Sequence, residues 1–133
     1  MVTEVVVKET ISSEMIDLGA DIVRRLDEAK FAVSAAFWFY LPESNVWRFF
    51  IANPRIRLDG VKQAYKKVQS ILSTMPENKP RIELKDISII DSNDALVSLL
   101  KMSIRAEGIN GIRFSKNIIN GVLIEDAYIY RMT

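Results

Sequence analysis

The residues most suited to catalysis by their types and spacing form a short acid–spacer–lysine sequence, Glu83-Leu84-Lys85. On a strand, alternation would place Glu83 and Lys85 on one side, where a carboxylate can hold Mg²⁺ and an ammonium can stabilise developing charge. This resembles part of a metal-dependent nuclease motif. Such a motif also needs an acidic ligand on a preceding strand, and residues 46–53 contain no carboxylate. We therefore interpret the pair as exposed charges on a strand edge.

The remaining carboxylates are explained by local structure. Asp91 and Asp94 stand where the start of a helix favours side-chain acceptors and negative charge, so capping accounts for them better than metal binding. Glu125 and Asp126 are adjacent on an expected strand, so they point to opposite faces and cannot act together as an acid–base pair. We expect no metal site and no cofactor.

The chain contains neither histidine nor cysteine. Their absence excludes serine–histidine and cysteine–histidine relays, imidazole and thiolate metal sites, and disulfides. No glycine-rich phosphate loop is present either. We expect no catalytic residue and a protein that is not an enzyme.

Uncompensated basic residues mark the solvent side of a helix expected near residues 58–75 and the segment just before it. They are Arg55, Arg57, Lys62, Lys66 and Lys67. Cations at this density could contact phosphates, and the binding would then weaken with salt. The formal net charge of only +1 gives no general attraction to polyanions, so an ordinary solvated face is the simpler interpretation. Nucleic-acid binding is the alternative function.

The elements that position these residues begin with two apolar segments, 31–41 and 46–53, joined by the turn-forming residues 42–45. They predict a β-hairpin in which Leu41 faces Val46. One face would then carry Phe37, Phe39, Arg48 and Phe50. The other face would carry Trp38, Tyr40, Trp47 and Phe49. Both faces are rich in aromatic residues, and packing in the core explains most of them. Rings that three helices leave uncovered could form a stacking platform for bases or a subunit interface, and we name the second set as candidate interface residues.

A second hairpin is indicated by Asn120-Gly121, a dipeptide that readily adopts the positive φ angles of a type I′ turn. Its register would pair Ile112 with Ile129, Arg113 with Tyr128 and Lys116 with Glu125. Apolar residues at three- and four-residue steps predict a helix starting near Ser13, which we expect to be its cap. Gly19 inside this helix suggests that a neighbour packs closely there.

Residues 1–133 are expected to form a single α+β domain with a mostly antiparallel mixed sheet of about six strands and three helices. The expected order is βαββαβαββ, with strands at residues 4–8 and 82–90 and a third helix from about residue 95 to 104. No apolar segment is long enough to span a membrane, and the first ten residues lack the pattern of a secretory signal, so we expect a cytoplasmic protein. The leading functional hypothesis is a protein-interaction or regulatory domain that self-associates, most simply as a homodimer.

Overall fold

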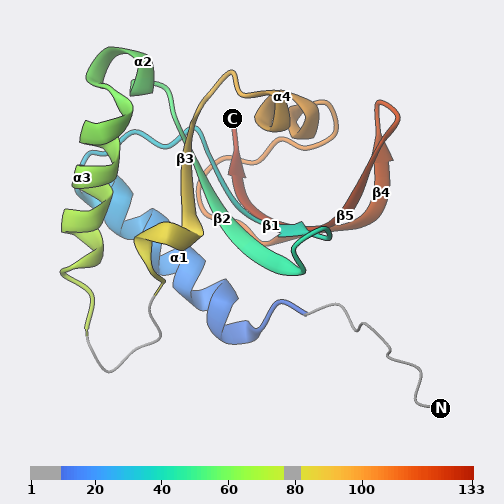
Figure 1. Ribbon diagram of the computed structural model, residues 1–133, viewed down its shortest axis with the longest axis horizontal. Coiled ribbons are helices and arrows are strands. Elements are labelled where there is room, and N and C mark those ends of the chain that lie inside the picture. The colour runs from blue at the N-terminus through green and yellow to red at the C-terminus, as the bar shows by residue number, and fades with distance from the viewer. Residues whose placement is uncertain (1–9, 77–81) are drawn as a thin grey trace.

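A computed structural model describes residues 10–76 and 82–133 and has an α+β fold built on one mixed sheet (Figure 1). The strand order is β3-β2-β1-β5-β4. The strands are β1 (Ala35–Leu41), β2 (Val46–Asn53), β3 (Ile87–Asp91), β4 (Ile112–Ile119) and β5 (Val122–Met132). The helices are α1 (Ser13–Glu28), α2 (Ile56–Asp59), α3 (Val61–Leu72) and α4 (Ala95–Lys101), with a 3₁₀ turn, η1 (Leu84–Asp86).

The expected α+β class is confirmed, with small differences in the elements. The described residues contain five strands and four α-helices, and the strand expected at residues 4–8 lies outside them. The single helix expected near residues 58–75 is divided into α2 and α3, because Gly60 between them has a φ of 90° that interrupts the helix. α4 ends at Lys101 rather than near residue 104.

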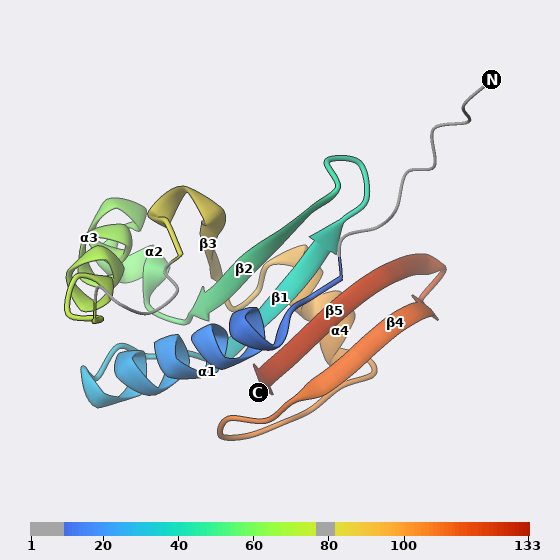
Figure 2. The ribbon, with the colours of Figure 1, turned by 90° about the horizontal axis from the view of Figure 1, so that it is seen from below.

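The sheet is strongly curved, and its two faces are covered to different extents. α1 and α3 lie on the convex side, while α4 is the one helix of the described residues on the concave side (Figures 1 and 2). β3 pairs with β2 in parallel, through the crossover made by α2 and α3, and the other neighbouring strands are antiparallel. No helix in the described part of the chain combines the length and apolar character that crossing a bilayer requires.

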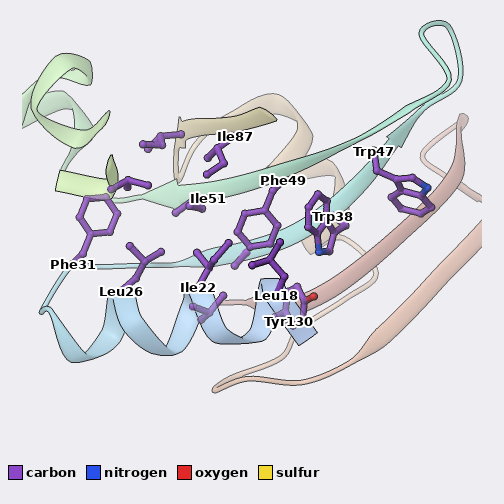
Figure 3. Packing of buried hydrophobic residues seen from close by; sticks show 14 of the residues in the cluster. Leu18, Ile22, Leu26, Phe31, Trp38, Trp47, Phe49, Ile51, Ile87 and Tyr130 are labelled. Carbon is purple, nitrogen blue, oxygen red and sulfur yellow. The ribbon is translucent and has the colours of Figure 1, made fainter. Parts of the chain in front are cut away.

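The convex core is anchored by α1, whose sequence explains both its start and its buried side. Ser12 rather than Ser13 caps the helix, since its hydroxyl accepts the Met15 N–H at 3.1 Å. Leu18, Ile22 and Leu26 follow at four-residue steps and pack against the sheet (Figure 3). The apolar residues whose spacing predicted this helix are therefore the ones that contact the sheet.

Both predicted hairpins have the expected registers over most of their length. Leu41 pairs with Val46, and Ile112 pairs with Ile129 as predicted. The regular ladder of the second hairpin is interrupted at Lys116, which has a φ of 49° and forms no ladder pair with Glu125. This local distortion shifts the alternation toward the hairpin tip, where Ile119 turns into the core.

Candidate functional site

The aromatic residues predicted for an interface lie inside the core of this chain. Trp38, Tyr40 and Phe49 are at most 4% exposed, and Trp47 is 8% exposed. The indole N–H of Trp38 donates to the carbonyl oxygen of Met15 in α1 at 3.0 Å, and the Trp38 and Phe49 rings lie 4.9 Å apart (Figure 3). These side chains fill the convex core instead of forming an exposed surface, so an interface has to be sought elsewhere.

The opposite face of the same hairpin is less completely covered. Phe39, Phe50 and Phe114 are only half-buried, although each packs against the core cluster that α4 covers. Strand alternation places Leu41 and Val46 on the same side, and Val46 is 42% exposed. We call these five side chains the concave patch.

The geometry of the concave patch is set by Ala127, which pairs with Phe39 on one neighbouring strand and with Phe114 on the other. Strands lie about 4.8 Å apart, so the two phenylalanines start about 10 Å apart on either side of a single methyl group. Phe39 and Phe50 meet edge to face, with ring centroids 6.2 Å apart. Arg48 pairs with Phe39 on this same face, and its guanidinium donates to the Ser88 hydroxyl at 2.5 Å. The patch is thus an ordered apolar surface around Ala127 with one hydrogen-bonded arginine beside Phe39.

The length of α4 explains why this face stays partly open. α4 has seven residues and spans only about 10 Å, whereas β5 has eleven residues and spans about 36 Å. One short helix therefore covers only part of the concave side. Leu96 and Leu99 of α4 are themselves half-buried beside the cluster.

Two of the basic residues considered for nucleic-acid binding are already engaged in ion pairs. Arg55 contacts Asp59 within α2 at 3.2 Å, and Arg57 contacts Asp91 at the end of β3. The backbone N–H of Asn93 and the guanidinium of Arg57 both donate to Asp91, which lowers the pKa of this carboxyl group. These two arginines therefore present partly compensated charge.

The three lysines of α3 are all exposed, but they do not face the same way. At 100° per residue, Lys62 and Lys66 share one stripe of the helix, whereas Lys67 is turned about 100° away from Lys66. Lys67 borders a hollow beside the helix that neither Lys62 nor Lys66 lines. The structure thus separates the five predicted basic residues into different environments.

The hollow has a volume of about 380 Å³ and lies where the end of α1, the end of β2 and helices α2 and α3 meet. Three basic residues border it: Lys30 just after α1, Arg55 just before α2, and Lys67 within α3. Its apolar lining is Ala29, Phe31, Ala32, Ile56, Ala64 and Ile71. We call it the basic hollow. The sequence placed Arg55 and Lys67 near one another but gave no sign that Lys30 would join them.

The possible nuclease fragment does not lie on a strand. Glu83 precedes the 3₁₀ turn η1, and Lys85 lies within it, so the expected strand at residues 82–90 begins only at Ile87. The two side chains are mostly exposed and approach each other at 3.5 Å. The charge-pair interpretation fits this geometry, but its placement on a strand edge was wrong.

Asp94 has the capping role that the sequence predicted, since its carboxylate accepts the Leu96 N–H at 2.9 Å at the start of α4. Asp91 instead accepts the Asn93 N–H in the preceding turn at 3.0 Å. Both carboxylates are therefore used in shaping the connection between β3 and α4. Among the residues described, no group of three acidic side chains could hold a metal ion.

Sequence reasoning missed a buried ion pair between Arg113 and Asp126. Asp126 is fully buried, and both of its carboxylate oxygens accept N–H groups of the Arg113 guanidinium. This hydrogen bonding raises the pKa of Arg113. The hairpin register contained the signal, because Asp126 lies diagonally across from Arg113, two residues before its direct partner Tyr128.

Comparisons of this chain with protein-family models, with curated proteins and with solved structures found no match. The concave patch and the basic hollow are therefore the features from which a function can be inferred.

Proposed function

We propose that this chain is a non-catalytic protein-interaction domain that forms a symmetric homodimer through the concave patch. The observation that supports this is the partly covered apolar face, where aromatic rings on β1, β2 and β4 lie beside a helix too short to cover them. Apolar surface of this kind gains free energy when another surface removes it from water. Aromatic side chains are also enriched at the centres of protein interfaces.

A second copy of the chain is the partner that best fits these properties. The formal net charge is +1, so two copies approach each other with little long-range repulsion. A two-fold axis brings the same patch from each copy together, and this symmetry is the commonest among soluble oligomers. In such a dimer, the rings around Ala127 of one subunit would pack against those of the other.

The proposed role is regulatory or structural because the sequence lacks the side chains of the common nucleophile relays. We place the domain in the cytoplasm, which stays a prediction from the sequence. Nucleic-acid binding receives less support, since the two arginines of the basic set are already paired with carboxylates.

Val46→Lys is the substitution that tests the patch with least risk to the fold. Val46 is 42% exposed, so a lysine there can reach water in the monomer but would place a charge in the dimer interface. We expect the dimer dissociation constant to rise by about tenfold or more. Sedimentation velocity over a range of protein concentrations measures this constant.

Leu58→Lys is the matched control, because Leu58 is 78% exposed on α2 and lies outside the concave patch. It introduces the same charge at another exposed apolar position and should leave the dissociation constant within about twofold of wild type. Circular dichroism and urea unfolding establish that both variants are folded. Equal weakening by both substitutions, or no effect of Val46→Lys on a dimer, would contradict the proposed interface.

A further inference from the structure

From the basic hollow we infer a second function: it is a binding site for a small phosphate monoester carried on an aromatic or other apolar body. Its volume of about 380 Å³ falls within the range of small-molecule pockets. Both apolar side chains and cations line it, so the site combines a surface for an apolar group with charge for an anion. The inference is independent of the proposed homodimer.

The charge of the hollow matches a dianion. Lys30, Arg55 and Lys67 supply three positive charges, and Asp59 supplies one negative charge that is already paired with Arg55. Within the described ranges, neither lysine has an ion-pair partner. The excess of two cations corresponds to the charge of a phosphate monoester near neutral pH, about −1.5 to −2.

Asn53 adds a positioned neutral donor at the hollow. Asn53 is only 5% exposed, and its Oδ1 accepts a hydrogen bond from the backbone N–H of Arg55 at 2.6 Å. This contact fixes the amide plane while Nδ2 has no protein acceptor among the described residues. Asn53 lines the hollow, so its Nδ2 can serve as a neutral donor to a ligand bound there.

The backbone at Lys30 has a conformation that usually favours glycine. Lys30 has a φ of 62° at the end of α1, where the Phe31 N–H donates to the Leu26 carbonyl oxygen at 2.9 Å. A lysine in the left-handed region carries a conformational cost that a glycine avoids. The φ of Lys30 thus has a conformational cost, and its side chain supplies a cation at the hollow.

The shape of the site favours a small ligand over a polymer. The cations that line the hollow converge on one concavity, whereas Lys62 and Lys66 point along a different stripe of α3. A nucleic-acid strand would engage an extended row of cations, and the five basic residues do not form one. A mononucleotide and another small aromatic phosphate share the chemistry that the hollow would recognise.

The test is a titration of the full-length, ¹⁵N-labelled chain with phenyl phosphate and with adenosine monophosphate, followed by amide chemical shifts. We expect saturable shifts at residues 29–32, 53, 55–56 and 67–71 with at least one of the two phosphates. Phenol and adenosine serve as the matched neutral ligands, and a single-stranded oligonucleotide represents the polymeric source of phosphate. Both neutral ligands should bind more weakly than the corresponding phosphates.

Lys67→Glu should weaken binding by about tenfold or more, because it replaces a contact cation with an anion. Lys66→Glu makes the same charge change one residue away on a different side of the helix, and should weaken binding by no more than about twofold. Both positions are exposed, so both variants should fold normally. Lys30→Gly should bind more weakly while unfolding at a higher denaturant concentration, a combination that general damage to the fold would not produce.

Three results would overturn the inference. The first is no saturable shift with either phosphate, and the second is equal weakening by Lys66→Glu and Lys67→Glu. The third is binding of the oligonucleotide alone, which would make the basic residues a nucleic-acid surface instead of a small-molecule site. Saturable phosphate binding with loss in Lys67→Glu but not in Lys66→Glu would support it.

Discussion

Gly19 is the residue at which sequence and structure agree most specifically. A glycine inside a helix suggested a close neighbour, and that neighbour is the ring of Tyr130 on β5. The Tyr130 hydroxyl donates to the Ile16 carbonyl oxygen at 2.6 Å, and burial raises the pKa of this phenol, so it stays a neutral donor. The sequence could not name Tyr130, because the contact joins residues more than a hundred positions apart.

Gly19→Ala should therefore destabilise the protein although alanine favours helices. A Cβ at this position would lie 2.2 Å from the Tyr130 hydroxyl oxygen, and the ring is confined within the core. We expect a loss of about 1 to 3 kcal/mol in the free energy of unfolding, measured by urea denaturation. This is the net loss, after the gain of about 1 kcal/mol that alanine brings through its helix propensity.

A double-mutant cycle with Tyr130→Leu provides the control for this contact. Removing the ring costs stability by itself, but Gly19→Ala should then cost less than it does in wild type. If Gly19→Ala made the wild-type protein more stable, the close packing described here would be incorrect.

Among the elements, hairpins were the most predictable because their signals are local. Short connections fixed the registers of β1–β2 and β4–β5. Alternation separated the two faces of β1 and β2, but in β4 it is interrupted at Lys116. The predictions for residues 58–75 and 82–90 were less accurate, because local sequence does not show where these helices and strands begin and end. Gly60 divides a continuous apolar pattern into two helices, and η1 occupies a segment whose composition resembles a strand.

The Asn120-Gly121 turn provides a test at the scale of one element. Both residues have positive φ, 49° and 78°, as a type I′ turn requires. Replacing both with valine should lower the free energy of unfolding by more than about 1 kcal/mol, because branched residues tolerate this conformation poorly. Chemical denaturation measures the change.

Replacing Asn120 with glycine is the conservative control, since glycine accepts the same φ without strain. That variant should stay within about 0.5 kcal/mol of wild type. An unchanged denaturation midpoint and slope in the double-valine variant would show that the turn does not set the register of this hairpin.

At the scale of the whole molecule, the sequence predicts a hairpin with two aromatic faces, but the candidate interface residues lie on the face that α1 and α3 cover. Strand alternation defines two sets of side chains without telling which set meets the longer helices. That assignment depends on α1 and α3 both packing on the convex side, an arrangement set by long-range contacts. The basic hollow was missed for the same reason, because it forms where segments distant in sequence meet.

The solution mass of the wild-type chain tests the central claim most directly. Sedimentation equilibrium at micromolar and higher concentrations, in buffer of moderate ionic strength, should give a mass close to twice that of the 133-residue chain. It should decline toward the monomer mass on dilution and should change little with salt, because the contact is apolar. A mass equal to one chain at every concentration would contradict the account.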